Sequence, residues 1–219
     1  VVAHEMDYEL LRTVPSALSG TATGVGYSRD VTTLLALAQY IRNLGYQAYA
    51  SMNDTALSIP MAIQAGLGEY GRHGLLITKE FGPRVRIGKV FTDLPLAHDK
   101  PINFGVEKFC SICRECTKAC PPGAIDDGNQ LETIYNQSNI PGIAKWTTDA
   151  EKCFDFWVKQ VTDCSICIRV CPYNRKMPKW AFKTWTMLMA TPFKRIILWL
   201  DKIIGQGKRN APSNWWKGH

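Results

Sequence analysis

The sequence predicts a mixed fold of helices and strands, of the α/β or α+β class, followed by a compact metal-binding segment and a helical C-terminal extension. Two observations indicate this organisation. Helix-like and strand-like patterns alternate through the first hundred residues, and all eight cysteines of the 219-residue chain lie between positions 110 and 171. Hydrophobic residues make up 46% of the chain, which is enough for a packed core.

The longest regular pattern in the first hundred residues is an amphipathic helix. We expect it to begin near Asp30, with Ser28 or Asp30 as its N-cap, and to end at Gly45. Its apolar residues recur at helical spacing and fall on one face: Leu34, Leu35, Ala38, Ile41 and Leu44.

Shorter elements follow this helix. A strand is predicted over residues 47–51, and a second helix over residues 56–65 with Pro60 in its first turn, where proline is tolerated. Two further strands are predicted over residues 74–78 and 85–91. The order of these elements is compatible with α/β or with α+β.

The chain is basic, with a formal charge of +7. No run of lysine or arginine reaches the length of a basic tail, so we expect no nucleic-acid partner; the charge suits an anionic membrane face or an acidic electron donor. Its strictly apolar runs are far shorter than the ~20 residues that a membrane span needs. Because the chain begins at Val1 rather than Met, we interpret it as a fragment whose export signal lies outside it.

The first cysteine group has the spacing C-x2-C-x2-C-x3-C-P, which is typical of bacterial two-cluster ferredoxins. It consists of Cys110, Cys113, Cys116 and Cys120, followed by Pro121. In this spacing the first three thiolates hold one [4Fe-4S] cluster, and the fourth holds the other.

The second cysteine group repeats the C-x2-C-x3-C-P ending, after one cysteine that is displaced upstream. The crossed arrangement predicts one cluster on Cys110, Cys113, Cys116 and Cys171. It predicts the other cluster on Cys120, Cys153, Cys164 and Cys167. A disulfide framework does not explain the paired Cys-Pro endings, and zinc knuckles lack the third cysteine. The segment is therefore interpreted as an electron relay.

Residues 66–71 match the pattern G-x-G-x-x-G, which can indicate a dinucleotide site. The context disfavours that interpretation, because the pattern follows a predicted helix and leads into a predicted strand, whereas a dinucleotide site has the reverse order. The glycines would instead allow the backbone to approach something large and flat, or simply form a turn.

Three stretches carry a family resemblance: GLGEYGRHGLLIT at residues 66–78, FGPRVR at 81–86 and VFTDLPL at 90–96. Together with the cysteine groups they resemble the catalytic subunit of corrinoid-dependent reductive dehalogenases. The resemblance implies a nitroreductase-like α/β corrinoid-binding domain, of which residues 1–103 are a part, and a ferredoxin-like segment with two [4Fe-4S] clusters at residues 104–175. Residues 176–219 would form a helical, aromatic and basic extension that packs on the catalytic domain or faces a membrane.

The resemblance also implies catalytic residues. Tyr27 would donate a proton to the carbon that loses halide, Arg86 would stabilise the phenolate left behind, and Asn53 would lie in the same pocket. These residue types suit the chemistry, because a guanidinium keeps its charge and favours a neighbouring phenolate. The residues alone also allow a loop cap for Tyr27, an Asx-turn for Asn53 and a solvated strand position for Arg86.

The implied cofactor is a cobalamin-type corrinoid in the base-off form, held largely by backbone contacts. Gly66, Gly68, Gly71 and Arg72 are the candidates for the loop beside it. Trp157, four residues after Cys153, is the candidate aromatic wall of the substrate pocket; a plain core tryptophan is the alternative.

The function that the resemblance implies is reductive dehalogenation of an organohalide, such as a chlorinated ethene, as the terminal step of anaerobic organohalide respiration. Electrons from a respiratory donor would pass through the two clusters to a Co(I) corrinoid. The family also implies export by the twin-arginine route to the outer face of the cytoplasmic membrane and a small integral-membrane anchor subunit. A homodimer is a further option.

Two other functions stay open. An epoxyqueuosine reductase of tRNA modification shares the corrinoid and the clusters, and the positive charge of the chain suits it. A ferredoxin-type electron carrier without catalysis would use the first hundred residues only as a docking scaffold. Bound corrinoid distinguishes the carrier from both enzymes.

Overall fold

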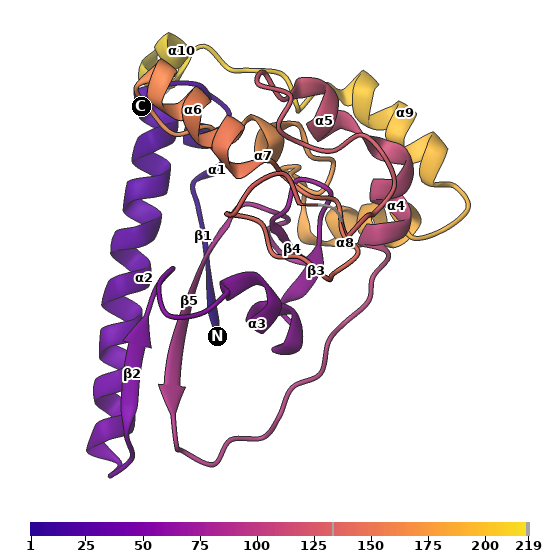
Figure 1. The fold of residues 1–219 in the computed structure, drawn as a ribbon. Coiled ribbons are helices and arrows are strands. Elements are labelled where there is room, and N and C mark those ends of the chain that lie inside the picture. The colour runs from indigo at the N-terminus through magenta and orange to yellow at the C-terminus, as the bar shows by residue number, and fades with distance from the viewer. Residues whose placement is uncertain (133, 218–219) are drawn as a thin grey trace.

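The computed structural model describes residues 1–132 and 134–217. Its first part is built on a three-stranded antiparallel sheet in the order β1-β5-β2 (Figure 1). The strands are β1 (Val2–Glu5), β2 (Ala48–Ser51) and β5 (Val85–Thr92), so the predicted strands at 47–51 and 85–91 are confirmed. Because the pairing is antiparallel, the class is α+β rather than a parallel α/β fold.

The long helix α2 (Ala17–Asn43) packs along this sheet (Figure 1). Its end agrees with the prediction, but its start near Asp30 was wrong, because Ser16 caps the helix through a reciprocal pair of hydrogen bonds with Ser19. The residues before Asp30 are mostly small or polar, so the apolar pattern begins later than the helix does. Leu34, Ala38 and Ile41 are buried as expected, whereas Leu35 and Leu44 are exposed.

Between β2 and β5 lie a short helix and a hairpin. Helix α3 (Ser58–Gln64) confirms the second predicted helix, with Pro60 in its first turn. Strands β3 (Gly68–Tyr70) and β4 (Leu76–Thr78) pair antiparallel, so the glycine-rich stretch forms a hairpin and not a dinucleotide-binding loop. A short helix α1 (Tyr8–Leu11) joins β1 to α2.

The cysteine-rich segment is made of short helices connected by loops. These are α4 (Val106–Cys113), α5 (Glu115–Ala119), α6 (Ala150–Gln160) and α7 (Ile166–Val170). Helices α5 and α7 pack against each other, which places the two Cys-Pro endings side by side. A buried cluster that includes Val106, Phe109 and Trp146 forms the local core.

The chain ends in α8 (Lys179–Met189), α9 (Lys194–Ile204) and α10 (Pro212–Lys217). They agree with the helical extension predicted for residues 176–219, and α8 and α9 lie beside the cysteine-rich segment (Figure 1). Trp185, Met189 and Ile197 join its core, while Trp199 and Ile203 are exposed. No helix within the described residues is long and apolar enough to cross a membrane.

Candidate functional site

Three side chains from distant parts of the sequence meet at one oxygen atom. Asn53 donates from Nδ2 to the hydroxyl oxygen of Tyr27 at 2.5 Å, and Arg86 donates from Nη1 to the same oxygen at 3.3 Å. The Arg86 guanidinium carbon also lies 4.5 Å from the centre of the Tyr27 ring. The phenol oxygen therefore accepts two hydrogen bonds beside a fixed positive charge.

Three elements position this group. Tyr27 lies in the interior of α2, Asn53 in the loop after β2, and Arg86 on the central strand β5. Gly26 lets α2 and β5 approach, since a Cβ at this position would lie only 2.9 Å from Cγ of Arg86. Tyr27 is thus fixed by helix packing and is not the loop residue that the sequence suggested.

A buried carboxylate lies behind the Tyr27–Arg86 pair. Asp30 follows Tyr27 by one helical turn and is only 1% exposed, with Oδ1 3.6 Å from Nε2 of His4. Burial raises the pKa of Asp30, and the charges of His4, Lys89 and Arg86 partly offset this effect. These groups form a charged layer between α2 and the sheet.

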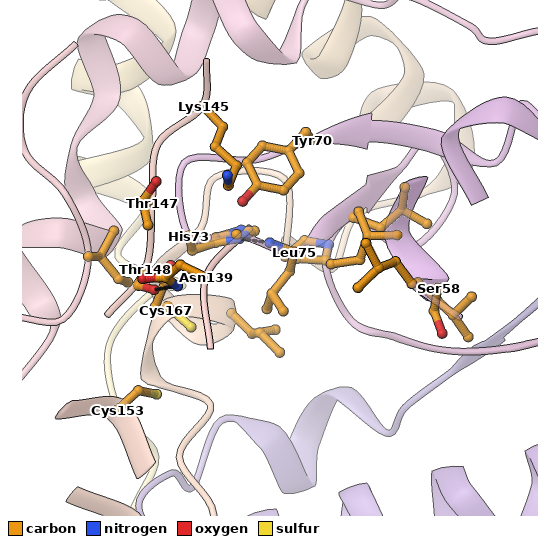
Figure 2. A pocket seen from close by; sticks show the side chains of 18 of the residues that line it. Ser58, Tyr70, His73, Leu75, Asn139, Lys145, Thr147, Thr148, Cys153 and Cys167 are labelled. Atoms are coloured by element: carbon orange, nitrogen blue, oxygen red, sulfur yellow. Dashed lines mark hydrogen bonds between the residues drawn. The ribbon is translucent and has the colours of Figure 1, made fainter. Parts of the chain in front are cut away.

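A large cavity of about 1140 Å³ opens beside this group. It is bounded by α3, the β3–β4 hairpin, β5, the loop before α6, and helices α6 and α7. Asn53 and Arg86 line one part of its wall. The thiols of one cysteine set line another part: Cys120, Cys153, Cys164 and Cys167. Figure 2 shows Ser58 of α3 on one side, Cys153 and Cys167 on the other, and His73 between them.

Most of the wall of this cavity is aliphatic, but it carries several polar atoms that lack partners. The aliphatic side chains include Leu57, Ile59, Ile63, Leu75, Val85, Ile87, Ile140, Ile143, Ile166 and Ile168. Four buried wall atoms have no hydrogen-bond partner within residues 1–132 and 134–217: Arg86 Nε, His73 Nε2, Thr148 Oγ1 and Trp157 Nε1. Buried polar atoms are rarely left unpaired, so this wall fits a large ligand with several hydrogen-bond acceptors.

The protonation of His73 indicates which kind of ligand atom the cavity can bind. Its Nδ1 accepts a hydrogen bond from the Leu75 N–H at 3.2 Å, drawn as a dashed line in Figure 2. Burial lowers the pKa of His73 to about 4, which keeps the imidazole neutral. With Nδ1 as acceptor, Nε2 carries the hydrogen, so His73 offers an N–H donor.

The eight cysteines form two adjacent sets. The first cysteine set surrounds one narrow space and consists of Cys110, Cys113, Cys116 and Cys171. The second cysteine set shares the wall of the large cavity and consists of Cys120, Cys153, Cys164 and Cys167. The pKa of Cys171 is raised by burial and by the other three thiols of the first set, and that of Cys167 by burial and by the other three thiols of the second set. Cys116 of the first set also raises the pKa of Cys167. The structure thus brings together the residues that the crossed spacing groups, and it places the two sets next to each other.

The chemistry of these thiols fits iron–sulfur clusters. Burial raises the pKa of Cys110 to about 12 and that of Cys116 to about 11. Thiols buried in this way keep their protons unless a cation replaces them, which bound iron does. Within the described residues, no group of three or more Cys, His, Asp or Glu side chains is arranged to hold a single metal ion.

Arg72 and the three glycines are placed differently from the expectation. None of the four is among the described residues that line the large cavity. Arg72 donates to the carbonyl oxygens of Cys110, Asp126 and Gly128, and its guanidinium stacks on Trp146. It therefore joins the hairpin to the cysteine-rich segment, and it lines the narrow space of the first cysteine set. A donor that does line the large cavity, Nε2 of His73, lies one residue further along.

The glycines have a packing explanation. A Cβ at Gly68 would lie 2.2 Å from the carbonyl oxygen of Ile77, and one at Gly66, where φ is +69°, would lie 2.8 Å from that of Lys100. A Cβ at Gly71 would lie 2.8 Å from the His73 ring. The hairpin and its connections thus require these glycines independently of any ligand.

Trp157 lines the large cavity, and its indole N–H is buried. It lies one turn after Cys153 on α6. Sequence reasoning missed His73, Thr148 and Asp30 as site residues. Only His73 had a usable signal, because it lies inside the glycine-rich stretch.

Two family models match the chain in succession. One, described as "Reductive dehalogenase subunit", matches residues 1–96, and the other, "4Fe-4S double cluster binding domain", matches residues 109–174. The boundary between them falls in the connection between β5 and α4. The second match identifies the cysteine-rich segment as a double-cluster domain.

Curated relatives agree with both models. A tetrachloroethene reductive dehalogenase of Desulfitobacterium hafniense is 46% identical over 175 residues, which is 78% of this chain and 32% of the relative. A second, from Sulfurospirillum multivorans, is 38% identical over 216 residues, or 96% of this chain and 42% of the relative. The chain thus spans less than half the length of these relatives. Epoxyqueuosine reductases also match, at lower identity and over smaller shares of the chain.

A solved structure extends the comparison to three dimensions. It is described as "Reductive dehalogenase structure suggests a mechanism for B12-dependent dehalogenation" and superposes with a TM-score of 0.82 at 29% identity. The match covers 94% of this chain and 30% of the other.

Proposed function

Because the chain belongs to the reductive dehalogenase family, we propose that the protein containing it reductively removes halide from an organic substrate, with a corrinoid and two [4Fe-4S] clusters as cofactors. The observation that carries this proposal is the large cavity. Its wall holds Arg86 and Asn53 on one part and the second cysteine set on another.

The residues of the large cavity fit a corrinoid. A volume of about 1140 Å³ exceeds the upper end of the range usual for small-ligand pockets, roughly 1,000 Å³. The aliphatic wall suits the faces of a macrocycle, and the N–H of His73 and the hydroxyl of Thr148 suit its peripheral amide oxygens. When bound, the corrinoid would supply a low-potential cobalt centre as the reductant for carbon–halogen cleavage.

The chain's own residues supply and control a proton. The Tyr27 hydroxyl oxygen accepts from Asn53 and Arg86, so its O–H hydrogen is free to point at a substrate carbon. Once the proton has left, the Arg86 charge and the Asn53 amide stabilise the phenolate oxygen at the same two positions. Asn53 and Arg86 thus stabilise the phenolate form of Tyr27 more than its neutral phenol form.

We propose that electrons enter through the first cysteine set and leave through the second. The second set shares the cavity wall, and helices α5 and α7, which carry Cys116 and Cys167, pack against each other. This order requires that electrons reach the cavity from the face where Cys110, Cys113, Cys116 and Cys171 lie.

For the substrate we propose a small, apolar organohalide such as a chlorinated ethene, which agrees with the aliphatic wall and with Trp157. We also propose a role in organohalide respiration at the outer face of the cytoplasmic membrane, through a membrane anchor subunit. The exposed apolar side chains of α9, including Trp199 and Ile203, support contact with such a partner.

The test uses the full-length protein, prepared without oxygen and loaded with corrinoid and clusters. Chloride release from tetrachloroethene with a low-potential reductant is the expected result. Loaded protein that releases no halide from any organohalide, yet reduces epoxyqueuosine in tRNA, would support the rival reductase. Protein with complete clusters and no corrinoid would support a plain electron carrier.

A further inference from the structure

We propose that the hydroxyl of Tyr173 donates a hydrogen bond to a sulfur atom of the cluster held by the first cysteine set, and thereby raises the reduction potential of that cluster. This inference rests on the proposed presence of the clusters. It concerns a residue that neither the sequence motifs nor the catalytic group includes.

Tyr173 is among the most buried large side chains of the chain, at 1% exposure. It follows Cys171 by two residues and lines the same narrow space as Cys110, Cys113 and Cys171. Its hydroxyl has no hydrogen-bond partner within the part of the chain that the structure describes. Buried hydroxyls are rarely left without a partner, so the partner is expected to be a group that occupies this space.

Aromatic packing fixes the direction of the Tyr173 ring. Phe104 and Phe109 meet it edge-on, with ring centres 6.0 and 5.7 Å away and interplanar angles of 79° and 85°. Both neighbours are apolar and offer the hydroxyl no acceptor. Tyr173 instead shares the narrow space with Cys110 and Cys171, the residues expected to hold the cluster.

The chemistry of the acceptor follows from its charge. A cubane bound by four thiolates is anionic and gains another negative charge when it is reduced. A neutral O–H donor stabilises the more negative form by a larger amount, so it raises the reduction potential. A phenol is ordinarily protonated at neutral pH and therefore acts as a donor here.

The position of this cluster gives the effect a function. The first set lies away from the large cavity, and its cluster would be the entry point for electrons. A higher potential at the entry makes it easier for a weak donor to reduce the protein. Tyr173 would thus set which donors can drive the reaction, as a positioning residue that does not touch substrate.

The test compares Tyr173→Phe with wild-type full-length protein, both loaded with clusters. Phenylalanine keeps the shape and the packing against Phe104 and Phe109, and it removes only the hydroxyl. Redox titration followed by electron paramagnetic resonance should show the midpoint of one cluster shifted to a more negative potential and the other unchanged. The control is Tyr8→Phe, which removes a buried hydroxyl that donates to Gln206; it should shift neither midpoint.

A second measurement keeps the inference testable if Tyr173→Phe loads only partly, because the iron–sulfur bands in resonance Raman spectra come only from chains that hold clusters. The iron–sulfur stretching bands of the wild-type protein in resonance Raman spectra should shift when H2O is replaced by D2O, and part of this shift should vanish in the variant. Unchanged midpoints with both clusters present would overturn the role of Tyr173 and leave the proposed function intact. Wild-type protein without clusters would instead contradict the proposed function.

Discussion

The Nδ2 atom of Asn53 lies 2.5 Å from the hydroxyl oxygen of Tyr27, and the two residues are 26 positions apart on different elements. Arg86 approaches the same oxygen from β5. Two donors on one phenol oxygen occupy its acceptor positions, so the O–H bond must point elsewhere. This arrangement orients a proton donor, which a lone tyrosine on a helix surface would not be.

Replacing Tyr27 by Phe should abolish most dehalogenation while both cofactors stay bound. General acid catalysis contributes about 10²–10⁴-fold, so a loss of at least about a hundredfold in turnover is expected. Halide release and corrinoid and iron content should be measured on the same preparation. Retention of most activity with full cofactor content would contradict the role of Tyr27 as proton donor.

Arg86→Lys should lower the turnover of the enzyme more than is usual for a conservative substitution. Lysine keeps the charge, but it lacks the planar fork that reaches the Tyr27 oxygen while stacking on its ring. Hydrogen bonds to charged groups contribute about 1.5–3 kcal/mol, so turnover should fall roughly ten- to a hundredfold. The comparison is Lys79→Arg, on a side chain outside the Tyr27 group, which should keep wild-type turnover. Equal rates for Arg86→Lys and wild type would show that only the charge matters.

Cys120→Ser should remove the cluster beside the large cavity rather than the one built by its own motif. Cys120 belongs to the first group in sequence but lies with Cys153, Cys164 and Cys167 in space. Iron content should fall from about eight to about four per chain, because each cubane holds four irons. The remaining cluster should still be reducible, while halide release is lost. Loss of the other cluster would refute the crossed assignment.

The sequence was sufficient for most elements, because their signals are local. The strand at 85–91 and the helix with Pro60 in its first turn follow from period and turn chemistry, and they were found nearly at their true bounds. The start of α2 was missed because small and polar residues carry no apolar pattern before Asp30, although Ser16 and Ser19 form a capping box. Helix caps made by two serines are a weak signal in sequence.

The candidate site, too, could be predicted from the sequence only in part. Tyr27, Asn53 and Arg86 were named from family resemblance, and only the fold shows that a sheet and a helix bring them to one atom. Arg72 was named because a glycine-rich stretch suggests a ligand; in the fold the glycines allow a tight hairpin, and Arg72 donates to the cysteine-rich segment. Asp30 depends on tertiary packing, so no local pattern could reveal it, whereas the place of His73 inside the glycine-rich stretch was a signal that went unused.

Asp30→Asn should change how stability depends on pH. Burial raises the pKa of Asp30 in the folded protein above the value of about 3.9 expected in the unfolded chain. Below both values the carboxyl is protonated in both states and costs nothing. As the pH rises between the unfolded and folded pKa values of Asp30, the carboxyl loses its proton more readily in the unfolded chain. The wild-type protein therefore loses stability over this pH range, and the asparagine variant does not. The thermal midpoint of the variant relative to wild type should therefore increase from pH 4.5 to pH 7.5.

His4, Lys89 and Arg86 face the same carboxylate, so the variant also leaves their charges less compensated. A relative midpoint that falls with rising pH would mean that these charges outweigh the burial of Asp30, and that the carboxylate stabilises the layer behind Tyr27.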